Sequence, residues 1–169
     1  MNLKRDALIF EIGQGPGILG KKLTERGYTN IHGADICAHF NEQAQGSGWY
    51  QSVKEMWFGR GVDQLPADMI GKFDLVMATG VFVDAHLPDI GFDEAHALLK
   101  TGGHFITSIR QYYFQDGHEL GYKEKIESLV AQGKWEIRKT WTFQRGIPNS
   151  IEPLFKEMTV FMFICRRLD

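Results

Sequence analysis

Three glycines, Gly13, Gly15 and Gly17, lie between an apolar segment and a stretch with helical spacing, where a strand is expected to turn into a helix. Glycine lacks a Cβ, so the backbone N–H groups of such a turn can approach a ligand closely. The unpaired N–H groups at the start of the following helix add partial positive charge. The sequence therefore predicts a loop that holds a nucleotide-like ligand.

The same string fits two kinds of nucleotide loop. Gly13-x-Gly15-x-Gly17 is typical of S-adenosylmethionine loops, whereas Gly15, Gly17 and Gly20 have the spacing of the dinucleotide fingerprint. When Gly13 is taken as the first glycine of that fingerprint, the third position falls on Ile18. The glycines alone leave both cofactors open.

Two acidic residues accompany the turn. Glu11 closes the apolar segment before it, and Asp35 ends the next apolar segment, 22 positions after Gly13. An ionised carboxylate only accepts hydrogen bonds, so an acid at the end of the second strand can hold both hydroxyls of a ribose. An acid in this position is also a common helix N-cap, and this alternative stays open for Asp35.

The length, composition and charge of the chain limit the classes of protein to which it can belong. The chain has 169 residues, 43% of them hydrophobic and 24% charged, which predicts one globular domain over residues 1–169. The formal net charge is −2 and the basic residues are scattered, so no nucleic-acid partner is expected. A small molecule is the expected partner, and the oligomeric state is left open.

The cysteines and histidines do not indicate a metal site. The two cysteines, Cys37 and Cys165, lack ligand spacing, and the six histidines show no pair four apart. The start of the chain does not resemble a signal peptide, and the longest nearly unbroken apolar segment, 158–165, is too short to cross a bilayer. We therefore expect a cytoplasmic protein with no membrane contact.

Apolar runs alternate with segments of helical spacing, which is the pattern of a parallel sheet in an α/β fold. The runs expected as strands are 7–12, 31–35, 53–58, 73–78 and 104–109. Helices are expected between Pro16 and Gly27 and over 39–45, 92–100 and 119–132. The Trp49–Tyr50 pair is expected to pack at the edge of the sheet.

The last two strands carry the most information about topology. From Trp135 to Phe143 apolar and polar residues alternate, whereas 158–165 is almost continuously apolar. Alternation predicts one solvated face and continuity predicts burial on both faces. The final strand must therefore insert inside the sheet, with the preceding strand further out. This favours the strand order 3-2-1-4-5-7-6 with strand 7 antiparallel.

Four segments in this order resemble the motifs of class I S-adenosylmethionine-dependent methyltransferases, and the resemblance implies their three-layer, Rossmann-like fold. They are the glycine turn, Asp35 within 32–36, the segment 78–82 and the turn at 98–105. Towards the end of the chain, Tyr122-Lys123-Glu124 and Gly133-Lys134-Trp135 resemble the methyltransferase-like proteins named after the Williams-Beuren syndrome region.

The resemblance also implies a role for individual residues. Glu11 would engage the amino group of the methionine part of the cofactor, Asp35 would hold the ribose, and Asp63 would lie near the adenine. S-adenosylmethionine would be the cofactor and S-adenosylhomocysteine the product. The full set of implied cofactor contacts is Glu11, Gly13, Gln14, Gly15, Gly17, Asp35, Ile36, Asp63 and Thr79.

The expected activity is in-line transfer of a methyl group to a small-molecule acceptor. Because the cofactor carries the activation, the protein mainly aligns the two reactants, and no obligatory catalytic residue is visible. His86 follows the fourth expected strand and either faces the acceptor or lies on the surface. Arg110, Tyr112 and Tyr113 follow the fifth and either line the same mouth or are exposed loop residues.

Two other functions stay open. Members of the resembled class usually carry helices before the first strand that cover the cofactor, whereas here that strand is expected about seven residues from Met1. The gene product is then truncated, or another subunit covers the site, or the protein is a binding module or inactive subunit without efficient catalysis. The other alternative is an NAD-dependent oxidoreductase that uses Gly15, Gly17, Gly20 and Asp35.

Overall fold

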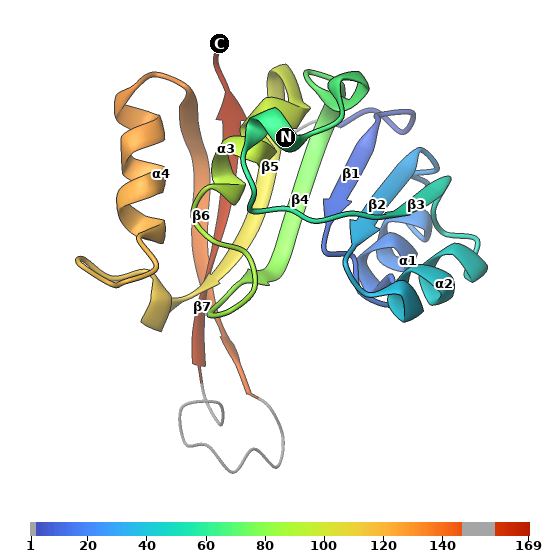
Figure 1. Cartoon of the computed structure of the whole chain (residues 1–169), viewed down its shortest axis with the longest axis horizontal. Helices are drawn as coiled ribbons and strands as arrows, with labels where there is room; N and C mark the ends of the chain where they lie inside the picture. The colour runs from blue at the N-terminus through green and yellow to red at the C-terminus, as the bar shows by residue number, and fades with distance from the viewer. Residues whose placement is uncertain (1–2, 147–157) are drawn as a thin grey trace.

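The computed structural model describes residues 3–146 and 158–169 and shows one seven-stranded mixed sheet (Figure 1). The strand order is β3-β2-β1-β4-β5-β7-β6, as the sequence predicted. Neighbours among the first five strands run parallel, whereas β7 is antiparallel to both β5 and β6. The strands are β1 (Ile9–Ile12), β2 (Ile31–Asp35), β3 (Ser52–Glu55), β4 (Phe73–Phe82), β5 (Leu99–Arg110), β6 (Trp135–Arg145) and β7 (Met158–Arg167).

Helices cover both faces of the sheet, which gives the three-layer fold. The larger apolar cluster joins one face to α3 (Gly91–Leu98) and α4 (Tyr122–Ala131). The smaller cluster joins the other face to α1 (Ile18–Thr24) and α2 (Ala38–Gly46), which lie over the β1–β3 end (Figure 1). Short 3₁₀ helices occur at η1 (Val62–Gln64), η2 (Ala67–Met69) and η3 (Gln111–Tyr113). None of the helices in the two described ranges is long and apolar enough to cross a membrane.

Several element ends differ from the sequence prediction. The third strand ends at Glu55 rather than at residue 58, because its neighbour β2 ends at Asp35, which pairs with Glu55. Without a partner strand, residues 56–58 leave the sheet. The fourth strand runs on to Phe82 through an irregularity in its pairing, and the third helix ends at Leu98 because Leu99 already belongs to β5.

The prediction that β6 has one solvated face was wrong. Trp135 is buried, but Ile137, Trp141 and Phe143 are 40%, 39% and 40% exposed. A bulge between Ile137 and Lys139 reverses the alternation, so Trp141 pairs with Met162 while Ile137 pairs with Cys165, on opposite faces of β7. Because β6 forms the edge of the sheet, much of it remains exposed on both faces.

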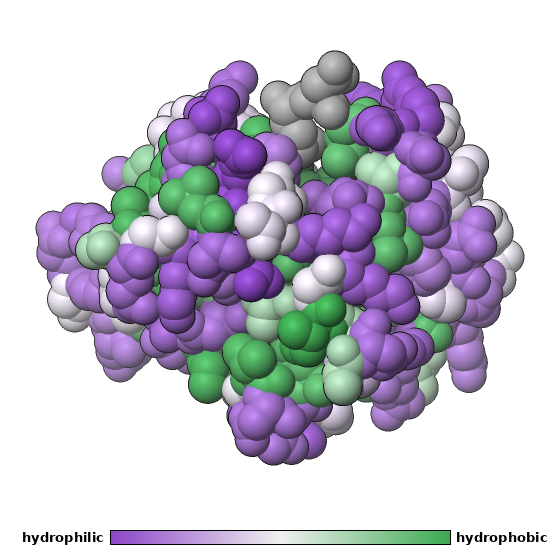
Figure 2. Space-filling model, turned by 90° about the horizontal axis from the view of Figure 1, so that it is seen from above, coloured by the Kyte–Doolittle hydropathy of each residue, from purple (hydrophilic) through white to green (hydrophobic). Residues whose placement is uncertain are grey.

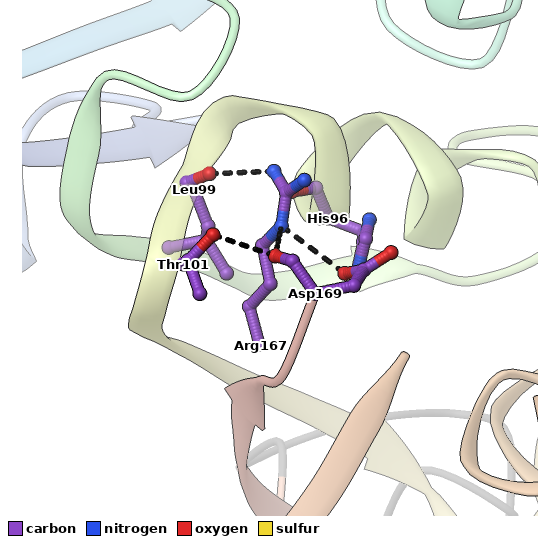
Figure 3. Close-up of polar contacts among 5 residues, drawn as sticks. All are labelled: His96, Leu99, Thr101, Arg167 and Asp169. Atoms are coloured by element: carbon purple, nitrogen blue, oxygen red, sulfur yellow. Dashed lines mark hydrogen bonds and ion pairs between the residues drawn. The ribbon is translucent and has the colours of Figure 1, made fainter. Parts of the chain in front are cut away.

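Polar contacts fix the end of β7 against the corner between α3 and β5 (Figure 3). The Arg167 guanidinium donates to the backbone carbonyls of Leu99 at 2.7 Å and His96 at 3.1 Å. His96 Nε2 lies 2.8 Å from Asp169 Oδ1, and burial lowers the pKa of His96 although Asp169 opposes the shift. Viewed from this end, where the parallel strands begin, the surface is mainly hydrophilic (Figure 2).

Candidate cofactor site

The glycine turn between β1 and α1 requires glycine. Gly13, Gly15 and Gly17 have φ angles of +65°, +53° and +91°, in the left-handed region that side chains disfavour. A Cβ on Gly13 would lie only 2.4 Å from Val81 Cγ1, so the turn packs closely against the segment that ends β4. The backbone of the turn is therefore held where a ligand can approach it.

Asp35 ties this turn to the start of α2. Its Oδ2 accepts a hydrogen bond from the Gly15 N–H at 3.0 Å, and its Oδ1 accepts one from the Cys37 N–H at 2.9 Å. The side chain is half-buried. Each carboxylate oxygen has a second lone pair, so the group can still accept hydrogen bonds from ligand hydroxyls. The N-cap of α2 is Cys37, so Asp35 does not have the N-cap role that the sequence left open, although it binds the N–H of that residue.

A cleft of about 220 Å³ opens beside the turn, at the carboxyl ends of β1 and β2. Three of the residues implied as cofactor contacts line it: Gly13, Asp35 and Ile36. The opposite walls are mostly apolar and come from the loop after β3 and the turn after β4. The complete lining is Ile12, Gly13, Ala34, Asp35, Ile36, Met56, Trp57, Phe58, Val81, Ala85, His86 and Leu87.

The six other implied contacts lie outside this lining: Glu11, Gln14, Gly15, Gly17, Asp63 and Thr79. The Gln14 side chain is buried, with Nε2 donating to Asn41 Oδ1 at 2.8 Å. Thr79 lies within β4 and pairs with Ser108 of β5, while its near neighbour Val81 reaches the cleft. Asp63 is exposed in η1, where its Oδ2 accepts from the Gln64 amide at 2.7 Å.

Glu11 lies beneath the turn rather than in the cleft lining, and only 3% of it is exposed. It accepts a hydrogen bond from the Tyr50 hydroxyl at 2.7 Å, and that hydroxyl accepts one from the Gly20 N–H at 3.1 Å. Burial raises the pKa of Glu11 to about 7, although the hydrogen bond from Tyr50 opposes the shift and the charge of Asp35 adds to it. Glu11 is thus a carboxyl group that titrates near neutral pH.

Contact with Tyr50 also explains why residue 20, the third position of the dinucleotide-like pattern, is glycine. Tyr50 lies just before the edge strand β3, its ring lies against α1, and a Cβ on Gly20 would be 2.3 Å from Tyr50 Cζ. Burial raises the pKa of Tyr50, and the neighbouring Glu11 raises it further. The close contact between α1 and Tyr50 accounts for Gly20 without a dinucleotide.

Sequence reasoning missed the carboxylate that shapes the loop after β3. Glu94 of α3 is fully buried and accepts hydrogen bonds from three consecutive backbone N–H groups, those of Gly59 at 2.6 Å, Arg60 at 2.9 Å and Gly61 at 2.8 Å. A signal was present, because Glu94 shares a helical face with buried Gly91, Ala95 and Leu98. An acid on an apolar face indicates a buried acceptor with backbone partners.

The residues at the end of β5 and in the loops after β4 and β5 line two different cavities. His86 lines the cleft beside the glycine turn. Arg110, Tyr112 and Tyr113 line a second cavity of about 240 Å³, together with Gln111, Gln115, Met158 and Thr159. His86 thus lies at the mouth of the cleft, where it is exposed on the surface.

The sheet order and the glycine turn define a class I S-adenosylmethionine-dependent methyltransferase fold. The chain belongs to the methyltransferase domain family, whose model matches residues 10–107. It is 31% identical over 154 residues to human methyltransferase-like protein 27, and the match covers 85% of this chain and 60% of that protein. The chain thus spans less than two thirds of this relative.

Solved structures show the same fold. An S-adenosylmethionine-dependent methyltransferase from Mesorhizobium loti has a TM-score of 0.64 and 16% identity, covering 98% of this chain and 94% of that chain. Magnesium protoporphyrin IX methyltransferase from Synechocystis PCC 6803, with bound S-adenosylhomocysteine, has a TM-score of 0.64 and 17% identity, covering 96% of this chain and 74% of that chain.

Proposed function

We propose that this protein transfers the methyl group of S-adenosylmethionine to a small-molecule acceptor by in-line displacement. The observation that carries the proposal is the cleft in which the glycine turn and Asp35 face the apolar loop 56–58. Polar groups at one side and apolar walls at the other suit a ligand that joins a ribose to an adenine and a thioether-like chain.

The residues present fit this cofactor. The close packing of Gly13 on Val81 leaves backbone rather than side chain at the turn, which suits the charged amino-acid end of the ligand. Asp35 would accept the ribose hydroxyls, and Ile36 and Trp57 would contact the adenine. The Arg60 guanidinium stacks 4.8 Å from the Trp57 ring centroid, and this contact helps to orient the indole.

Glu11 would interact with the amino group of the bound cofactor from beneath the turn. S-adenosylmethionine supplies an activated methyl group on a sulfonium leaving group. The chain itself then has to align the acceptor with that methyl and keep water out. The apolar residues Val81, near the end of β4, and Leu87, in the turn after it, would exclude water from this part of the cleft.

Calorimetric titration with S-adenosylhomocysteine, S-adenosylmethionine and NAD tests the proposal. We expect both sulfur compounds to bind and NAD not to bind. D35N should weaken binding of S-adenosylhomocysteine at least about tenfold, because a charged acceptor at the cleft is lost. D68N is the matched control, since Asp68 is exposed in η2 outside the cleft lining, and should leave binding unchanged. Binding of NAD without binding of S-adenosylhomocysteine would refute the proposal.

A further inference from the structure

One histidine, His86, lies at the proposed cofactor cleft and has a ring nitrogen that can accept a proton. His86 lines the cleft on the turn after β4, beside Val81 and Leu87. Its Nδ1 lies 2.9 Å from the backbone carbonyl oxygen of Asp84. A carbonyl only accepts hydrogen bonds, so Nδ1 carries the proton and Nε2 of the neutral ring is left as a proton acceptor.

The backbone holds His86 in this place. Leu87 N–H donates to the Val81 carbonyl at 3.1 Å, and His86 N–H donates to the Val83 carbonyl at 3.2 Å, which closes a tight turn. Ala85 lies directly before His86 and has a φ of 58°. In the described part of the chain, no other non-glycine residue has a positive φ. Such a conformation persists only where the surroundings impose it, and it is common at functional sites.

The cleft offers one other titratable side chain among the described lining residues, that of Asp35. Its carboxylate accepts backbone hydrogen bonds from Gly15 and Cys37, and its remaining lone pairs are those proposed to accept the ribose hydroxyls. Asp84 adjoins His86 in the chain and contributes its backbone carbonyl to the ring. His86 is therefore the group in this lining with a ring nitrogen lone pair that can accept the proton of an acceptor.

We propose that His86 is the general base of the reaction and that the acceptor is a hydroxyl, phenol or thiol that loses its proton during transfer. This rests on the proposed function. The acceptor oxygen or sulfur forms a bond to the methyl carbon, and the carbon–sulfur bond of the donor breaks with its electron pair left on sulfur. The acceptor proton passes to Nε2 of His86 and is later released to water. A carboxylate acceptor, which is already ionised, has no need of this base.

The H86N variant removes the proposed base but can keep the hydrogen bond to the Asp84 carbonyl. An asparagine amide can still donate to the Asp84 carbonyl but offers nothing in place of Nε2. H39N is the matched control, because His39 is exposed on α2 outside the cleft lining. Transfer is followed from methyl-labelled S-adenosylmethionine into a protein-free small-molecule cell extract, with wild type and both variants. S-adenosylhomocysteine binding is measured in parallel by calorimetry.

We expect H86N to bind S-adenosylhomocysteine as wild type does, while its transfer rate falls about 100-fold or more. Labelled products should resist mild alkali, as ethers and thioethers do and methyl esters do not. Equal transfer by H86N and H39N, or alkali-labile products, would overturn the role of His86 while leaving methyl transfer intact. Binding without any transfer by wild type would overturn both the base and the proposed catalysis.

A second readout does not depend on turnover. Nitrogen-15 NMR of the free protein, with the His86 signals assigned by comparison with H86N, reports which ring nitrogen carries the proton. We expect the neutral ring to be protonated at Nδ1. A ring protonated at Nε2 would overturn the proposal, since that nitrogen could not accept a proton.

Discussion

The Tyr50 hydroxyl donates a 2.7 Å hydrogen bond to Glu11, a carboxyl group with 3% exposure directly beneath the glycine turn. The same hydroxyl accepts a hydrogen bond from the Gly20 N–H of α1. The protonation state of Glu11 is therefore connected through one side chain to the helix that follows the turn. Two consequences can be measured, one for stability and one for ligand binding.

E11Q should change how stability depends on pH. The folded pKa of Glu11 is raised from 4.5 to about 7, so folding favours its protonated form. This contribution is fully present below pH 4.5 and is lost as the pH rises towards 7. Relative to wild type, E11Q should gain about 3 kcal/mol in free energy of unfolding between pH 4.5 and 8. Urea unfolding across this range checks it, and parallel curves for the two proteins would contradict it.

Binding of S-adenosylhomocysteine should release protons near pH 7. The ammonium group of the ligand favours the ionised form of Glu11, which in the free protein titrates at about pH 7. The apparent binding enthalpy of wild type should therefore differ between phosphate and Tris buffers, which have different ionisation enthalpies. E11Q should show little difference. A buffer dependence that persists in E11Q would assign the proton to another group.

Alanine at two of the turn glycines should have unequal effects. G15A introduces a side chain at a φ of +53° with no atom within 4 Å of its Cβ, so only backbone strain of about 1 to 2 kcal/mol is expected. G13A adds a 2.4 Å contact with Val81 and should cost about 1 to 3 kcal/mol more. Urea unfolding measures both. V81A should restore part of the loss in G13A and none of that in G15A.

E94Q should destabilise the protein and loosen the loop after β3. Glutamine can supply one acceptor oxygen where three backbone N–H groups now bind a carboxylate, so we expect a loss of about 2 to 3 kcal/mol. The adjacent D93N removes only a partly exposed ion pair with Lys125 and should cost less than about 1 kcal/mol. S-adenosylhomocysteine affinity should fall in E94Q and stay near wild type in D93N. Equal losses in the two variants would show that Glu94 does not shape the cleft.

The topology could be predicted from the sequence because one strand carried the decisive pattern. Continuous apolar residues in β7 require a strand inside the sheet, and the structure confirms β7 between β5 and β6. The position of Asp35 beside the glycine turn could also be predicted, because the carboxyl ends of β1 and β2 meet at one edge. Both inferences start from the apolar pattern within single segments, which is a local property of the sequence.

The rest of the site depends on contacts between distant segments. Residues 56–58 have the apolar character of a strand, and only the end of β2 at Asp35 shows that they leave the sheet and line the cleft. The bulge in β6 likewise depends on the pairing of this strand with β7, which no local pattern contains.

A crystal structure with S-adenosylhomocysteine tests the central claim most directly. We expect the ligand in the cleft, with its ribose hydroxyls on Asp35, its adenine against Ile36 and Trp57, and its sulfur on the side of the cleft that carries His86. A ligand bound elsewhere on the molecule, or a cleft that stays empty at saturating ligand, would contradict the assignment of this cleft as the cofactor site.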